Sequence, residues 1–123
     1  MARILVIDDQ AHIRTIMKEF FSIEQHEVDL AENGKEGMKL FGLHQYDLVI
    51  TDVVMPDYDG FEVILAIKRQ NPLAKIIAMS GGAAKLAISD LLDLSQLYGA
   101  DRVLSKPLNF SRLQTVVNEV LDQ

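Results

Sequence analysis

Short runs of apolar residues recur along the chain, and most of them are followed by Asp, Ser or Gly. Five runs share β-branched or aliphatic side chains: Ile4–Ile7, Val28–Leu30, Leu48–Ile50, Ile76–Met79 and Val103–Leu104. The first, third and fourth are apolar without alternation, which indicates strands buried on both faces of a parallel sheet. Val28–Leu30 alternates apolar and polar residues, as an edge strand does. The pattern therefore predicts five strands.

Between these runs the apolar residues change to helical spacing. Two segments repeat apolar residues at intervals of three and four, namely Ile13, Ile16, Met17, Phe20 and Phe21, and Phe110, Leu113, Val116, Val117, Val120 and Leu121. Asn33 followed by Glu36 is typical of a helix N-cap with a capping-box acid. A third helix is outlined around Phe61–Lys68 and closed by Asn71 and Pro72. Strand and helix thus alternate along the chain.

Five strand–helix repeats limit the fold. Crossovers between parallel strands are almost always right-handed, so helices must cover both faces of the sheet. We therefore expect an α/β fold with a doubly wound, five-stranded parallel sheet in a (βα)5 three-layer sandwich. A length of 123 residues suits a single domain over residues 1–123.

Composition excludes several classes of protein. An apolar fraction of 49% argues against a disordered chain. Twelve basic against 18 acidic residues give a net charge of −6, which argues against nucleic-acid binding by this domain. No apolar run approaches the roughly 20 residues of a membrane span. The chain has no cysteine, which excludes disulfides and thiolate metal sites and fits a cytoplasmic location.

Polar residues with chemical potential follow four of the five predicted strands. Asp8 and Asp9 come after the first, Asp52 after the third, Ser80 after the fourth and Lys106 after the fifth. Each has an ordinary explanation alone, as a helix cap, a turn residue or a solvated lysine. Ligands bind to doubly wound sheets at the carboxyl ends of the strands. The joint placement therefore predicts one functional site.

Three neighbouring carboxylates disfavour one another's ionisation, because like charges raise each other's pKa. A hard divalent cation such as Mg²⁺ relieves this repulsion and then binds phosphate oxygens. One carboxylate can then act as a nucleophile toward a phosphoryl group. Lys106 would supply a cation for the phosphoryl oxygens, and Ser80 a hydroxyl donor.

These motifs resemble the receiver domain of two-component response regulators, of the chemotaxis-regulator type, over essentially the whole chain. The resemblance is carried by the Asp8-Asp9 pair, the run Asp52–Gly60 (D-x-x-M-P-x-x-D-G), Ser80, and the Lys106-Pro107 pair. It implies a flavodoxin-like fold with strand order 2-1-3-4-5. It also implies a signalling switch that catalyses its own phosphorylation and dephosphorylation.

The resemblance assigns roles to the main site residues. It implies that Asp52 accepts a phosphoryl group from the phosphohistidine of a histidine kinase or a histidine phosphotransfer protein. It implies that Mg²⁺ is held by Asp8, Asp9, Asp52 and the backbone carbonyl of Val54. Lys106 is expected to pair with the bound phosphoryl group.

Further positions follow from the same resemblance. Ser80 would turn toward the phosphoryl group, and Gly81 would leave the pocket open. The peptide bond before Pro107 is often cis in this family. Val103 occupies a position where the family usually has Tyr or Phe, so the aromatic switch is missing here. Tyr98, in the loop before the fifth strand, is the candidate substitute.

The segment between Ser80 and Lys106 predicts a fourth helix that is apolar over a wide arc. It is either part of the core or a docking surface. In the second case an output partner or a second copy would bind the face from the fourth to the fifth helix.

A pseudo-receiver that binds partners without phosphorylation is the alternative function. A haloacid-dehalogenase-type hydrolase is disfavoured, because Asp8–His12 lacks the Asp-x-Asp-x-Thr pattern.

Overall fold

The computed structural model describes residues 1–53, 60–80 and 99–123. Strands and helices alternate in the order β1 (Arg3–Ile7), α1 (Ala11–Ile23), β2 (Glu27–Ala31), α2 (Gly34–Leu43), β3 (Leu48–Asp52), α3 (Gly60–Gln70), β4 (Ile76–Ser80), β5 (Arg102–Ser105) and α5 (Phe110–Leu121). Each predicted strand is present within two residues of its expected bounds. The predicted fourth helix lies in 81–98, outside the described residues.

The five strands form one parallel sheet in the order β2-β1-β3-β4-β5. This confirms the strand order that the family resemblance implied. β2, the alternating strand, lies at one edge, and the three uniformly apolar strands lie inside the sheet. The pattern of the strands therefore predicted their depth in the sheet correctly.

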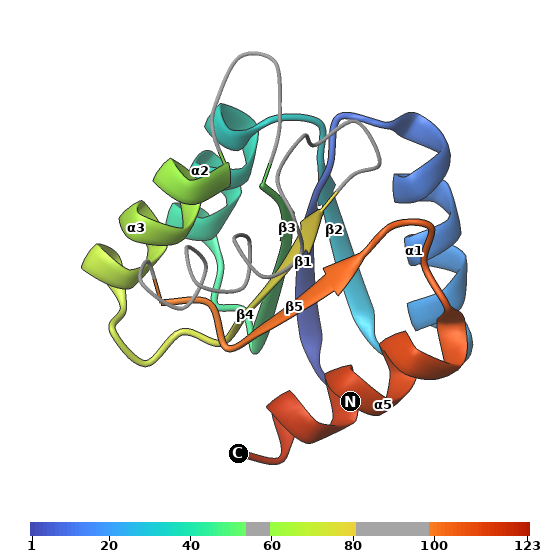
Figure 1. The fold of residues 1–123 in the computed structure, drawn as a ribbon. Coiled ribbons are helices and arrows are strands. Elements are labelled where there is room, and N and C mark those ends of the chain that lie inside the picture. The colour runs from blue at the N-terminus through green and yellow to red at the C-terminus, as the bar shows by residue number, and fades with distance from the viewer. Residues whose placement is uncertain (54–59, 81–98) are drawn as a thin grey trace.

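Helices cover both faces of the sheet (Figure 1), with α1 and α5 on one side and α2 and α3 on the other. Successive side chains of a strand point to opposite faces. In β1, Ile4 and Val6 pack toward α1 and α5, whereas Leu5 and Ile7 pack toward α2 and α3. A uniformly apolar strand therefore serves two separate cores.

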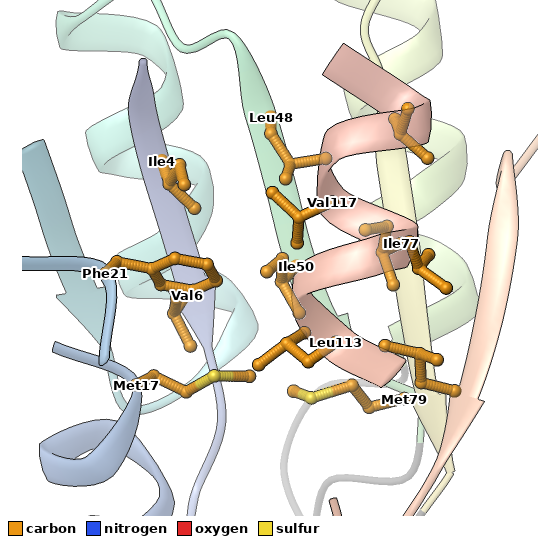
Figure 2. Close-up of a cluster of buried hydrophobic side chains, with 13 residues drawn as sticks. Ile4, Val6, Met17, Phe21, Leu48, Ile50, Ile77, Met79, Leu113 and Val117 are labelled. Carbon is orange, nitrogen blue, oxygen red and sulfur yellow. The ribbon is translucent and has the colours of Figure 1, made fainter. Parts of the chain in front are cut away.

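The core between the sheet and α1 and α5 is shown in Figure 2. Met17 and Phe21 of α1, and Leu113 and Val117 of α5, point toward side chains of β1, β3 and β4. Met17 and Leu113 are fully buried. This packing fixes α1, and with it the turn that leads from β1 into α1.

Two local features of the helices agree with the sequence. Asn33 is the N-cap of α2, and its side chain accepts a hydrogen bond from the backbone N–H of Glu36 at 2.8 Å. α3 ends at Gln70, just before Asn71 and Pro72. Among the helices described, none is long and apolar enough to cross a membrane.

Candidate functional site

Three aspartates meet at the carboxyl ends of the central strands. Asp8 directly follows β1, and Asp52 is the last residue of β3, the strand that pairs with β1. Asp8 is fully buried, Asp52 is 3% exposed, and Asp9 is exposed. One carboxylate oxygen from each of the three lies within 4.8 Å of the others. The structure therefore gathers the three acids that the sequence singled out.

Lys106 reaches the same place from the end of β5. Its Nζ lies 2.6 Å from Oδ2 of Asp8 and 3.0 Å from Oδ2 of Asp52. Only 8% of the Lys106 side chain is exposed. The alternative of a solvated lysine is therefore wrong. The Lys106–Pro107 peptide bond is cis, as the resemblance implied.

The ammonium of Lys106 is strongly held in its charged form. Burial lowers the pKa of Lys106, because it disfavours the charge. Hydrogen bonds and charge attraction from Asp8 and Asp52 outweigh burial, so the pKa lies above the usual lysine value. Lys106 is therefore a permanent cation against two buried carboxylates at neutral pH.

Sequence reasoning missed two residues at this site, Gln10 and Arg14. Gln10 is the N-cap of α1, which excludes Asp9 from that role. Its backbone N–H donates to Oδ1 of Asp8 at 2.8 Å, and its side-chain Oε1 accepts from Nζ of Lys106 at 2.8 Å. Nη1 of Arg14 donates to the backbone carbonyl of Asp8 at 2.8 Å. Their only sequence signal was their closeness to the Asp8-Asp9 pair.

Of the remaining residues predicted for the site, the structure describes some and not others. Ser80 ends β4, in register with Ser105 of β5. Val103 is half-buried and packs against the core on the α2 and α3 side of the sheet. Val54 and Gly81 lie outside the described residues, as does Tyr98.

The side chains present fit a hard divalent cation. The candidate ligands are all oxygens, which Mg²⁺ prefers to nitrogen or sulfur. Among the described residues, three carboxylates against the ammonium of Lys106 and the guanidinium of Arg14 leave the site net negative, and two of the carboxylates are buried. An added cation would therefore offset an electrostatic cost that Lys106 and Arg14 only partly offset. The exposed carboxylate of Asp9 gives an ion access from solvent.

Known proteins that are similar to this chain in sequence or structure include response regulators and a chemotaxis protein. TrrA of Thermotoga maritima, a response regulator solved in complex with Mg²⁺-BeF, is 41% identical with a TM-score of 0.84, and the match covers 98% of this chain and 99% of TrrA. The chemotaxis protein CheY of Bacillus subtilis is 31% identical over 121 residues, which is 98% of each chain. The transcriptional regulatory protein PcoR of Escherichia coli is also 31% identical over 121 residues.

TrrA and CheY match over nearly their whole length, whereas PcoR is longer than this chain. The PcoR match covers 98% of this chain but 52% of PcoR, so the chain spans about half the length of such regulators. The family model of the response regulator receiver domain matches residues 4–118. This match, the strand order and the acidic site agree, and the chain belongs to the response regulator receiver domain family.

Proposed function

We propose that this receiver accepts a phosphoryl group on Asp52 in a Mg²⁺-dependent reaction and thereby switches its contacts with other proteins. The donor would be the phosphohistidine of a histidine kinase or of a histidine phosphotransfer protein. The observation that carries the proposal is the cluster of Asp8, Asp9 and Asp52 at the carboxyl ends of the central strands, with the ammonium of Lys106 paired to Asp8 and Asp52.

The transfer exchanges one bond to phosphorus for another. A carboxylate oxygen of Asp52 attacks the phosphorus of the donor as the P–N bond breaks. The bonding electron pair returns to the imidazole nitrogen, and Asp52 becomes an acyl phosphate. Hydrolysis reverses the switch: water attacks the phosphorus, the P–O bond to Asp52 breaks, and inorganic phosphate leaves.

Residues around Asp52 would stabilise the charge that develops during this transfer. The ammonium of Lys106 pairs with Asp8 and Asp52 in the structure. During the transfer it would pair with the phosphoryl oxygens instead and stabilise their developing negative charge. Ser80 would donate its hydroxyl to the same group. Asp8 and Asp9, with Asp52 and the Val54 carbonyl, would hold Mg²⁺. When bound, Mg²⁺ neutralises negative charge shared by the carboxylates and the phosphoryl oxygens.

The readout of phosphorylation would differ from that of receivers with an aromatic switch. Val103 stands at the aromatic position and already packs against the core. We infer that the signal passes through Ser80 and the surface from the fourth to the fifth helix, to an output partner or a second copy. A cytoplasmic location, and a single domain over residues 1–123, stay predictions.

The test is intact-protein mass spectrometry after incubation with acetyl phosphate and Mg²⁺. We expect one added phosphoryl group on the wild type, and none on Asp52→Asn or after EDTA. Asp122→Asn is the matched control, because Asp122 is exposed at the end of α5, and it should accept phosphate as the wild type does. Isothermal titration with Mg²⁺ is run in parallel.

Two results would contradict the proposal. Labelling of Asp52→Asn at the wild-type level would show that another residue is the acceptor. A wild type that neither gains mass nor binds Mg²⁺ would favour the pseudo-receiver alternative, a module that binds partners without phosphorylation.

A further inference from the structure

Gln10 occupies the N-cap of α1, but its side chain does not cap the helix. No side-chain capping hydrogen bond is made there. Glutamine is not among the residues favoured at this position, which are Ser, Thr, Asp and Asn. The side chain instead reaches across to Lys106, 96 residues away in sequence. Helix capping therefore does not explain what the Gln10 side chain does.

The contact between Gln10 and Lys106 has a defined direction. An ammonium can only donate, so the amide oxygen of Gln10 faces Nζ of Lys106, at 2.8 Å. Among the residues that the structure describes, the other two acceptors of this ammonium are Oδ2 of Asp8 and Oδ2 of Asp52. A lysine ammonium has three hydrogens, and these three acceptors match that number.

The three acceptors differ in what happens to them during the proposed reaction. Asp8 and Asp52 are both candidate metal ligands, and Asp52 is also the proposed phosphoryl acceptor. A divalent cation on these carboxylates repels the ammonium and competes for the same oxygens. Gln10 is neutral, and its side chain offers an amide oxygen in place of a carboxylate. Of the three hydrogen bonds of Lys106, the one to Gln10 is therefore the one whose acceptor is neither a candidate metal ligand nor the proposed phosphoryl acceptor.

We propose that Gln10 is a positioning residue, which keeps the ammonium of Lys106 in the site while the lysine exchanges its carboxylate partners for phosphoryl oxygens. The inference rests on the proposed function and deepens it. It acts on the rate of transfer and not on metal binding, because Gln10 holds Lys106 both with and without the metal.

The two contacts of Gln10 can be separated by mutation. The bond to Asp8 comes from the backbone N–H, which every side chain except proline leaves in place. Gln10→Met keeps the length of the side chain and removes the strong oxygen acceptor. Gln114→Met is the matched control, because Gln114 is an exposed glutamine on α5 with one side-chain hydrogen bond, to Glu24.

The experiment measures three quantities in wild type, Gln10→Met, Lys106→Met and the double variant. At saturating Mg²⁺ and acetyl phosphate, Gln10→Met should lose roughly fivefold in phosphorylation rate, as for one lost hydrogen bond. The Kd for Mg²⁺ should stay within about twofold. In the Lys106→Met background, Gln10→Met should cost nothing further, because both variants remove the same interaction. Gln114→Met should match the wild type.

A third readout does not depend on phosphoryl transfer. Reductive methylation, followed by peptide mass spectrometry, measures the fraction of Lys106 amines that become methylated. This fraction is lower when the amine stays bound to its partners. With Mg²⁺ bound, Gln10→Met should raise the labelling of Lys106 severalfold over the wild type.

The outcomes separate this inference from the proposed function. A wild type that takes no phosphate overturns the proposed function, and the labelling of Lys106 still decides the role of Gln10. Equal labelling in wild type and Gln10→Met overturns the inference. So does a rate loss that persists in the Lys106→Met background, or one that a parallel loss of Mg²⁺ affinity explains.

Discussion

His26 is a half-buried imidazole that accepts a hydrogen bond at Nδ1 from the backbone N–H of Ala2, at 2.9 Å. Burial lowers the pKa of His26, because it disfavours the charged ring. The unfolded chain therefore binds this proton first as the pH falls. The stability that His26 contributes is present above its unfolded pKa of about 6.5, and it is lost as the pH falls through the lower folded pKa.

We expect the free energy of unfolding to decline between pH 7 and pH 5, and to decline less in His26→Asn. Asparagine offers an acceptor oxygen to Ala2 but does not titrate. Urea unfolding at several pH values measures the difference, and His44→Asn controls for the loss of an exposed imidazole. An equal decline in wild type and His26→Asn would refute the assignment.

The lower limit of pH 5 keeps another group out of that measurement. Burial raises the pKa of Asp29, but hydrogen bonds from Tyr46 and Arg3 outweigh burial and hold it below the usual aspartate value. The stability contributed by Asp29 is therefore lost only as the pH falls below about 4.

Residue type together with position at a strand end predicted some residues of the site and not others. Asp8, Asp9, Asp52 and Lys106 were predictable, because parallel strands bring their carboxyl ends to one edge. Gln10 was not, because its role depends on where a flexible side chain points across the site. Strand-end position fixes the Cα of a residue but not the partner of its side chain.

α2 approaches β1 closely at one glycine. A Cβ added to Gly37 would overlap Cδ1 of Ile7 and lie 2.8 Å from its Cγ1. The Ile7 side chain is fully buried, so it has little room to move. In the same helix, a Cβ on Gly42 would meet nothing within 4 Å. These two glycines separate helix propensity from packing.

We expect Gly37→Ala and Gly42→Ala to change stability in opposite directions. Alanine favours a helix over glycine by up to about 1 kcal/mol, so Gly42→Ala should stabilise by about 0.5 kcal/mol near the end of α2. Gly37→Ala should destabilise by about 1–2 kcal/mol, because overpacking outweighs the propensity gain. Urea unfolding of both variants measures this. Stabilisation by Gly37→Ala would show that Ile7 can move aside.

The sequence predicted which segments form strands and helices better than it predicted which of these elements lie next to each other. Uniform apolar runs identified the inner strands, and the alternation in Val28–Leu30 identified an edge. Periodicity gives no order for strands that are equally apolar, so the order 2-1-3-4-5 came from the family resemblance. Nor does it show that α2 approaches β1 closely at Gly37, since a glycine fits many contexts.

At the scale of the whole molecule, folding creates the acidic site. Asp8 and Asp9 follow β1, and Asp52 ends β3, more than 40 residues later in the chain. Their carboxylates come within 4.8 Å only because β1 and β3 pair in the sheet. The unfolded chain offers no such cluster. A cation that binds the cluster must therefore stabilise the folded state over the unfolded one.

We expect Mg²⁺ to raise the free energy of unfolding by RT ln(1 + [Mg²⁺]/Kd), about 2.7 kcal/mol when the ion is at 100 times its Kd. Asp9→Asn should reduce this gain. Asp9 is exposed, so the substitution removes a candidate ligand without opening a cavity in the core. Chemical unfolding over a Mg²⁺ series measures the gain, with NaCl at matched ionic strength as the control for screening. An equal gain in NaCl, or an undiminished gain in Asp9→Asn, would contradict Mg²⁺ binding at this cluster. Because unfolding reports binding without any phosphoryl donor, it tests the metal site independently of the transfer reaction.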